Sequence, residues 1–185
     1  WPLLLCAVLC GCGGGETGNA VQEQYSTLET ARLEAEVTSH TSTDSRTFTL
    51  LCSYDADGDA VTTVTAPGEL AGLTAVASGA DMTMRSEGLQ LPAGASLDIC
   101  PANCLPYLLR ALADGYVLEQ SSEALDNTPC LRLALDTTAP GGGKVLCAVW
   151  LDAEGLFPRY AEFSRNEQVV LTVKLLAFTC TTSEG

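Results

Sequence analysis

Alternation of apolar and polar residues runs through most of the chain and predicts a protein built mainly from strands. Between Ala31 and Val37 every second residue is apolar, and the residues between them are charged. Successive side chains of a strand point to opposite faces, so this pattern indicates a strand with one buried face. Short segments of the same kind follow, separated by turn residues, which is typical of an antiparallel meander. We expect strands at 31–37, 46–55, 60–66, 73–78, 81–85, 88–91, 116–122, 129–136, 144–152, 157–164 and 169–179.

Helical spacing appears in two places. Residues 21–30 contain helix formers, with Tyr25 and Leu28 three positions apart. Residues 100–114 carry one strongly apolar stripe, with proline near the start and Gly115 after the end. The stripe consists of Leu105, Leu108, Leu109 and Leu112. A helix with one such stripe must bury it, so we expect this helix to pack on the sheet.

The first residues predict export and lipid anchoring. An apolar run from Leu3 to Cys12 is too short to span a bilayer but has the length of a signal-peptide core. Its end, Leu9-Cys10-Gly11-Cys12, resembles the lipobox of bacterial lipoproteins, in which the cysteine thiol takes up the lipid. We therefore expect residues 1–11 to be a signal peptide that is truncated at its start, because the basic region that normally opens such a signal is missing. After it we expect a lipidated Cys12 and a flexible tether over 12–20, and then one domain over 21–180. The alternative is a buried apolar strand at the start of a domain.

Charge narrows the possible partners. The chain has 9 basic and 23 acidic residues, giving a formal net charge of −14. Binding to nucleic acid needs clusters of lysine and arginine, so the composition argues against a nucleic-acid partner. It also argues against electrostatic adhesion to anionic lipids. The membrane is therefore expected to be a partner through the N-terminal lipid, with the domain held outside the cytoplasm.

Six cysteines follow Cys12, and two of them suggest a disulfide. We expect a hairpin turn over 137–143, with Cys130 directly opposite Cys147 on the strands that it joins. In that register Leu131, Leu133 and Leu135 share one face with Leu146, Ala148 and Trp150, and the two cysteines meet on the other. A Cys130–Cys147 disulfide is our hypothesis, and two neighbouring reduced thiols are the alternative.

No motif in the sequence indicates a catalytic site, a metal site or a cofactor site. The acidic run Asp55–Asp59 has calcium-like spacing, but its glycine is misplaced, so a tight turn explains it better. Cys100 and Cys104 are not spaced as a zinc pair, and His40 is the only histidine. A Ser-His-Asp site would need the same histidine and a nucleophile elbow that is missing. We therefore expect no enzyme, no metal and no cofactor, and His40 as a surface residue of a strand.

What remains is the shape of the molecule. A long antiparallel sheet could curl over its helices as an open barrel and leave an apolar hollow for a lipid or peptide. Candidates to line that hollow are Trp150, Phe163, Leu108, Leu109 and Leu112. A filled core with no ligand is the alternative.

Three short motifs resemble one family. They are the turn Pro67–Gly72, the helix Pro101–Leu112, and Val149–Asp152 followed by Gly155–Pro158. With the lipobox, they resemble the LolA/LolB-like bacterial lipoproteins, in particular the clostridial members that include the germination lipoprotein GerS. The resemblance implies a mainly β fold with a few helices, namely an unclosed antiparallel barrel of about eleven strands whose helices cover the concave side.

The resemblance leaves two functions open. One is a non-catalytic binding module in a Gram-positive cell envelope, implied by GerS-like members that bind a cortex amidase during sporulation and germination. The other is a carrier or chaperone for lipid or lipoprotein acyl chains, implied by LolA and LolB. A large apolar cavity would favour the carrier, and a filled interior with an exposed sheet edge would favour the binding module.

Overall fold

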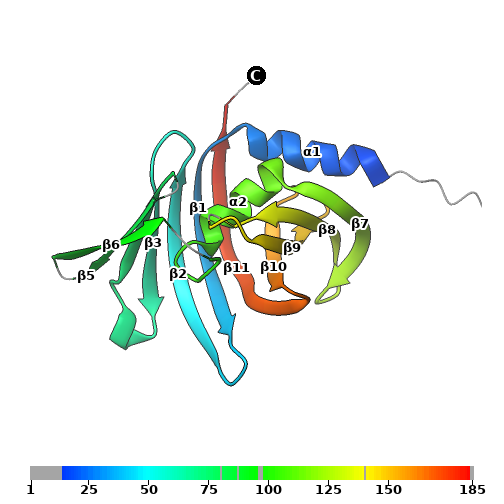
Figure 1. The fold of residues 1–185 in the computed structure, drawn as a ribbon. Coiled ribbons are helices and arrows are strands. Elements are labelled where there is room, and N and C mark those ends of the chain that lie inside the picture. The colour runs from blue at the N-terminus through cyan, green and yellow to red at the C-terminus, as the bar shows by residue number, and fades with distance from the viewer. Residues whose placement is uncertain (1–13, 80, 87, 96–97, 140, 184–185) are drawn as a thin grey trace, which may run out of the picture.

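The protein is a single curved antiparallel sheet with two helices, shown in Figure 1. This is a computed structural model that describes residues 14–79, 81–86, 88–95, 98–139 and 141–183. The helices are α1 (Gly14–Ser26) and α2 (Cys104–Asp114), with a short 3₁₀ turn η1 (Gly68–Leu70). The strands are β1 (Leu28–His40), β2 (Ser45–Asp55), β3 (Ala60–Ala66), β4 (Thr74–Ser78), β5 (Asp81–Ser86), β6 (Leu89–Ala95), β7 (Tyr116–Leu125), β8 (Thr128–Thr138), β9 (Lys144–Asp152), β10 (Pro158–Arg165) and β11 (Gln168–Thr182).

The strand order shows how the two halves of the chain, each a series of hairpins, form one sheet. It runs β6-β5-β4-β3-β2-β1-β11-β10-β9-β8-β7, so the long strands β1 and β11 lie at the centre and β6 and β7 form the two edges. The chain must therefore travel from one edge to the other between β6 and β7. It does so through α2, which crosses the concave side of the sheet (Figure 1).

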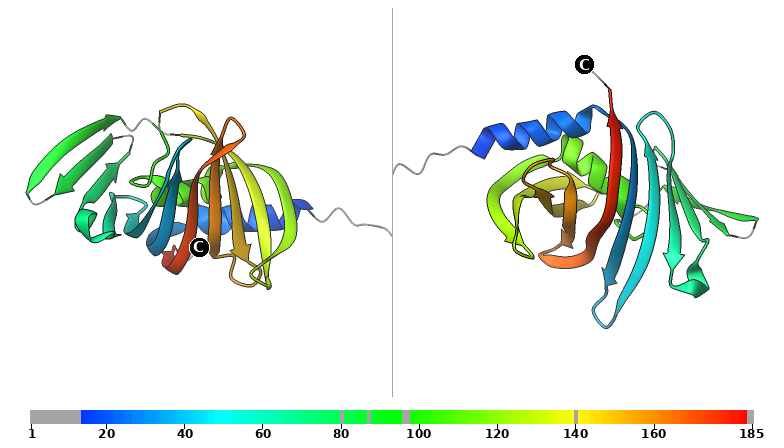
Figure 2. Two further views of the ribbon diagram at one scale, coloured as in Figure 1. Left: turned by 90° about the horizontal axis from the view of Figure 1, so that it is seen from below. Right: turned by 180° about the vertical axis from the view of Figure 1, so that it is seen from behind.

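The two halves of the sheet differ in curvature. As Figure 2 shows, β11 to β7 curl around α2, whereas β3 to β6 flare away from it. Helix α1 lies across one end of the curled half, where it contacts α2 and β7. The helices therefore cover only part of the concave face.

The core lies between α2 and the curled half of the sheet. Strand β1 shows why: Leu33, Ala35 and Val37 are fully buried, while the residues between them are exposed. The same period places Val145, Cys147, Val149 and Leu151 of β9 inside. The stripe of α2 is buried completely against these residues, with Leu105, Leu108 and Leu112 each 0% exposed. The expected packing of this helix on the sheet is confirmed.

The turn that leads into α2 is stabilised by the side chain of Asn103. Asn103, which precedes the helix, accepts the backbone N–H of Cys100 and donates its amide to the carbonyl of Asp98. The turn at Cys100–Asn103 is therefore outside the helix, which begins four residues later than the sequence predicts. Arg165 forms an ion pair of 2.7 Å with Asp98 and ties this turn to β10.

Helix α1 corrects the expected tether. Residues 14–20, assigned from their glycines to a flexible segment, form the first half of α1, and the helix ends at Ser26. Tertiary packing explains the difference, because Val21 and Tyr25 are buried and Gly18 lies close to Val117 of β7. Gln22 also donates to the carbonyl of Gly115 at 2.6 Å. Buried contacts of this kind outweigh the low helix propensity of glycine.

The fold class is confirmed: an unclosed antiparallel barrel of eleven strands with helices on the concave side. The predicted signal peptide and the lipidated Cys12 lie outside the described residues. Within the described part of the chain, neither helix has the length and apolar character needed to cross a bilayer.

Candidate functional site

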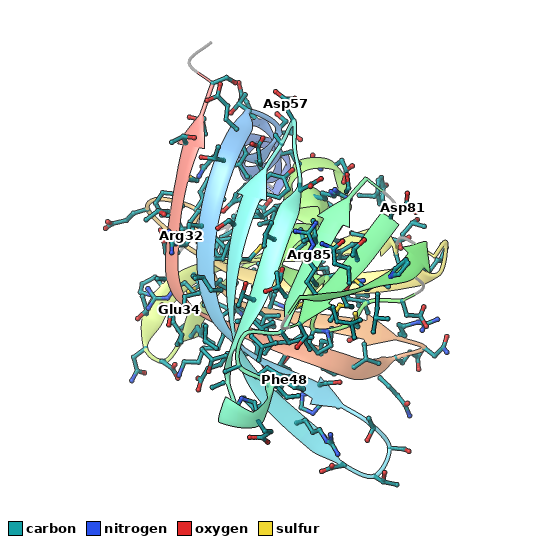
Figure 3. All side chains as sticks on the ribbon, turned by 90° about the vertical axis from the view of Figure 1, so that its left-hand side faces the viewer. Arg32, Glu34, Phe48, Asp57, Asp81 and Arg85 are labelled. Carbon is teal, nitrogen blue, oxygen red and sulfur yellow. The ribbon has the colours of Figure 1, made fainter. Side chains whose placement is uncertain are left out.

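An apolar groove lies on the concave face, in the half of the sheet that the helices leave uncovered. It has a volume of about 200 Å³ and is bounded by strands β2 to β5, by η1 and by the turn before α2. Figure 3 views the molecule from the side on which β5 and β6 lie in Figure 1, with Phe48 of β2 labelled. The groove is lined by Phe48, Leu50, Thr62, Val64, Leu70, Leu73, Ala75, Met84, Cys100, Pro101 and Ala102.

Strand register assembles the groove from four strands. Leu50 lies opposite Val64 in the β2–β3 pair, and Ala75 lies opposite Met84 in the β4–β5 pair. All four side chains point to the face that carries the core, because they share the period of the buried positions. The groove is thus a continuation of the core that α2 does not reach. Leu70 at its rim is 36% exposed.

The lining is suited to holding an apolar group. Nine of its residues are hydrocarbon or thioether in character, and only Thr62 and Cys100 bring a hydroxyl or thiol. Burial raises the pKa of the Cys100 thiol, which keeps it protonated at neutral pH. A protonated thiol is a poor nucleophile, so this cysteine supplies no reactive group. Binding here would rest on the removal of apolar surface from water.

Two further thiols lie behind the groove. Burial raises the pKa of Cys52 to about 11, an effect that the neighbouring Thr62 hydroxyl offsets in part. Burial also raises the pKa of Cys104, which is fully buried at the start of α2, well above its usual value. Both are free thiols. In the described part of the chain, no three histidine, cysteine or acidic side chains gather as they would around a metal ion.

Four of the five residues expected to line a hollow lie together, but in the packed core. Phe163 of β10 and Leu108, Leu109 and Leu112 of α2 are at most 1% exposed and belong to one cluster. The ring of Phe163 meets that of Tyr107 edge-on at 5.8 Å. The groove described above is lined by other residues, so these four fill space beneath α2.

Trp150 is the fifth, and its predicted position was wrong. It lies on the outer face of β9, between the buried neighbours Val149 and Leu151. There its indole N–H donates to Glu123 at 2.9 Å, and the Arg132 guanidinium stacks over its ring at 5.3 Å. This hydrogen bond is the main reason that the pKa of Glu123 is lowered.

The predicted disulfide between Cys130 and Cys147 is also wrong. Cys130 pairs with Asp152 and Cys147 pairs with Leu135, so the two cysteines are not opposite each other. The hairpin closes with Thr138 opposite Lys144, which differs from the expected register by five residues, and an odd difference exchanges the two faces of β9. Cys147 therefore points into the core, whereas Cys130 lies on the other face, and both are free.

The remaining sequence candidates are structural. Asp55 accepts the backbone N–H of Asp57 at 3.0 Å, which makes the acidic run between β2 and β3 a tight turn, as expected. His40 ends β1 at the surface and contacts the hydroxyls of Ser45 and Thr172. The alternation over 46–55 does place Phe48 and Leu50 on one face of that strand, but the sequence does not say which strands the helices leave uncovered.

Comparison with solved structures identifies similar folds at low sequence identity. A DUF1329 family protein from Desulfovibrio piger ATCC 29098 is 13% identical with a TM-score of 0.53, covering 92% of this chain and 94% of that one. The LolA superfamily protein NE2245 from Nitrosomonas europaea is 12% identical with a TM-score of 0.48, covering 90% and 94%. The GerS lipoprotein of Clostridioides difficile, in its complex with the CwlD amidase, is 16% identical with a TM-score of 0.36, covering 92% and 94%.

No family model and no curated protein matches the sequence. At such identities structural similarity shows the fold alone. The likeness to the Desulfovibrio protein therefore supports what the strand order already establishes, an unclosed antiparallel barrel.

Proposed function

We propose that this protein is a non-catalytic binding module of the cell envelope, anchored by a lipid on Cys12. The observation that carries the proposal is the filled interior: the side chains of α2 that face the sheet are buried and close-packed. The groove beside them, at about 200 Å³, is smaller than the roughly 300–1,000 Å³ typical of ligand pockets. Its size suits one or two apolar side chains of a protein partner better than several acyl chains.

Open edges support the same proposal. Strand β6 forms one edge of the sheet and exposes Leu89 and Leu91, at 59% and 56%. Strand β7 forms the other edge and exposes Tyr116 and Leu118, at 72% and 55%. Free edges with exposed apolar residues favour association with another chain.

A carrier of acyl chains is the second candidate, favoured by the apolar lining of the groove. Native mass spectrometry of the full-length protein, extracted in mild detergent, separates the two. For the binding module we expect a mass increase equal to the anchor, lost in Cys12→Ala, and no further lipid. A stoichiometric lipid that remains on Cys12→Ala would reject the module and support the carrier.

Binding in the groove can be tested with variants of this chain and a small probe, before any partner is identified. Met84→Glu places a carboxylate in the groove, and Thr83→Glu places one on the neighbouring residue of β5. If the groove holds apolar groups, Met84→Glu should lower the affinity for a fluorescent fatty-acid probe or an apolar peptide at least tenfold relative to Thr83→Glu. Equal binding by the two variants would show that the groove is not the site.

A further inference from the structure

The neighbouring strands β10 and β11 separate partway along their length. From the turn at Arg165 the two strands pair as far as Tyr160 and Lys174, with one register shift between Phe163 and Ser164. Beyond that point β10 continues to Pro158 along β9, and β11 continues to Thr182 along β1. The two strands no longer pair with each other, and a cleft opens between them.

Irregularities on both strands explain the opening. The register of β10 against β9 shifts between Pro158 and Tyr160, which makes Arg159 an extra residue. The register of β11 against β1 shifts where Leu175 is followed by Ala177, which makes Leu176 an extra residue. Bulges bend a strand and increase its twist. Pro158 also lacks the N–H that would continue the pairing.

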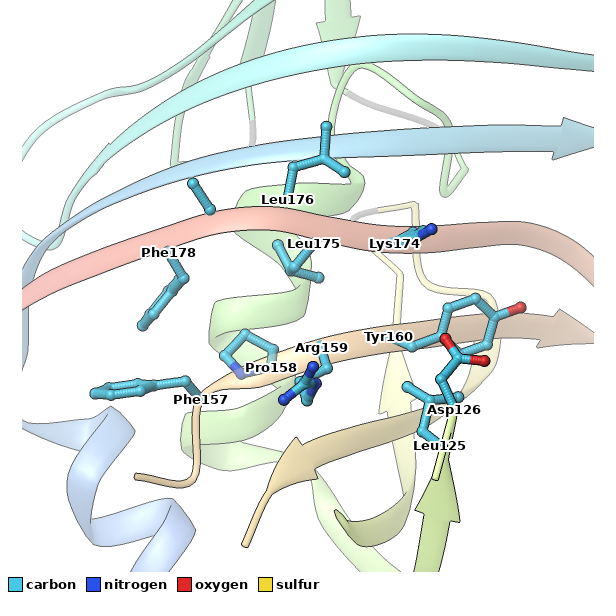
Figure 4. A pocket seen from close by; sticks show the side chains of 11 residues that line it. Leu125, Asp126, Phe157, Pro158, Arg159, Tyr160, Lys174, Leu175, Leu176 and Phe178 are labelled. Carbon is cyan, nitrogen blue, oxygen red and sulfur yellow. The ribbon is translucent and has the colours of Figure 1, made fainter. Parts of the chain in front are cut away.

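The resulting cleft, which we call the fork, has a volume of about 510 Å³. Figure 4 shows its two walls, with Leu175 to Phe178 of β11 on one side and Phe157 to Tyr160 on the other. The fork is lined by Leu125, Asp126, Phe157, Pro158, Arg159, Tyr160, Lys174, Leu175, Leu176, Ala177 and Phe178. Strand β1 lies between the fork and the strands that line the apolar groove, so the two sites are separate.

Aromatic and aliphatic side chains form the inner end of the fork. The rings of Phe157 and Phe178 lie 5.4 Å apart, and that of Tyr25 lies 6.4 Å from Phe178. Phe157 is 40% exposed and Leu176 at the rim is 49% exposed. A ligand in the fork would therefore cover apolar surface that water now contacts.

The wall formed by β11 is an open backbone edge. Among the described residues, Leu175 to Thr182 pair with β1 on one side and with no strand on the other. Alternate N–H and C=O groups of such an edge point outward and can pair with an added strand. The fork thus offers both main-chain hydrogen bonds and an apolar surface, the combination used in strand addition.

Charge at the rim differs from the rest of the molecule. Arg159 and Lys174 line the fork with one acid, Asp126, whereas acids outnumber bases by 23 to 9 in the whole chain. Within the described part of the chain, neither Arg159 nor Lys174 forms a salt bridge with another side chain. These two cations are available to a carboxylate of a ligand.

We propose that the fork binds an extended peptide segment of a partner protein, in which apolar and acidic residues alternate. The segment pairs through its backbone with the open edge of β11. Its apolar side chains contact Leu175, Phe157 and Phe178, and its acidic side chains face Arg159 and Lys174. The period of two in a strand places the two kinds of side chain on opposite faces, as this arrangement requires.

The test uses a synthetic peptide, acetyl-(Glu-Val)₃-amide carrying a fluorophore, and fluorescence anisotropy with the full chain. Its controls are the corresponding lysine–valine peptide and a version with alternate amide nitrogens methylated. We expect the acidic peptide to bind at least tenfold more tightly than either control, and amide hydrogen exchange over 175–181 to slow when it binds.

Variants of the protein test the charge. The double variant Arg159→Glu with Lys174→Glu should weaken peptide binding at least tenfold. Arg85→Glu, a charge reversal at an exposed position of β5 (Figure 3), should change it less than twofold. Three results would each overturn the proposal: equal binding of the acidic and basic peptides, unchanged exchange over 175–181, or a fork that binds palmitate but no peptide. Because the apolar groove is a separate site, its own variants decide the proposed function independently.

Discussion

Truncation of Leu108 tests the filled interior on which the proposed function depends. Leu108 lies in the middle of α2 and is 0% exposed within the core cluster. Leu108→Ala removes three carbon atoms, each worth about 0.8 kcal/mol of burial, so the transfer loss is about 2.4 kcal/mol. A cavity left in a packed core adds to this loss, and we expect a total of about 3–4 kcal/mol.

Urea unfolding followed by circular dichroism measures this change as a shift in midpoint at constant slope. In thermal unfolding the same loss should lower the Tm by roughly 10 °C for a chain of this length. Leu118→Ala is the matched control, because Leu118 is 55% exposed on the edge strand β7, and it should cost about 0.5 kcal/mol or less.

The reasoning fails if the two variants lose similar free energy. In an open hollow, Leu108 would contact solvent or a displaceable ligand, and its truncation would cost less than about 1 kcal/mol. Such a result would mean that the interior is not packed in solution and would favour the carrier.

Three further outcomes follow from the structure. Burial raises the pKa of Cys52 from 9 to about 11 and that of Cys147 further. The stabilising contribution of each buried neutral thiol is complete below pH 9 and falls as the pH rises toward its own raised pKa; for Cys52 it amounts to about 3 kcal/mol and is lost by about pH 11, and Cys147→Ala should flatten the fall in Tm between pH 8 and 11. Gly115→Ala would place a Cβ against the backbone carbonyl oxygen of Ala111, so we expect a loss of about 1–3 kcal/mol in urea unfolding. Trp150→Ala should destabilise the fold by about 1–2 kcal/mol and leave binding in the apolar groove unchanged, because the indole lies on the outer face; reduced binding of the fatty-acid probe would contradict that placement.

The alternation of residues was enough to predict the strands and the class of fold. Segments such as 60–66 and 144–152 coincide with β3 and β9. The reason is physical: a strand buried on one face needs an apolar residue at every second position, and this requirement is local. The apolar stripe of α2 was equally readable, since burial of one helix face imposes its own spacing.

Register and coverage depended on the tertiary structure. The hairpin after β8 closes with Thr138 opposite Lys144, which places Trp150 on the outer face and separates Cys130 from Cys147. Strand β9 is apolar at every position from Val145 to Leu151, so its own pattern does not decide which of its faces is buried. The glycines of α1 became helical because α2 and β7 supply contacts far away in the chain.

Both candidate sites depend on the tertiary structure. The apolar groove exists because α2 covers one half of the sheet and leaves the other open, and the fork exists because bulges on β10 and β11 meet at the same level. Each strand's own sequence determines which of its residues are apolar. Only the assembled sheet decides which apolar residues are covered, because coverage is a property of elements distant in sequence that meet in space.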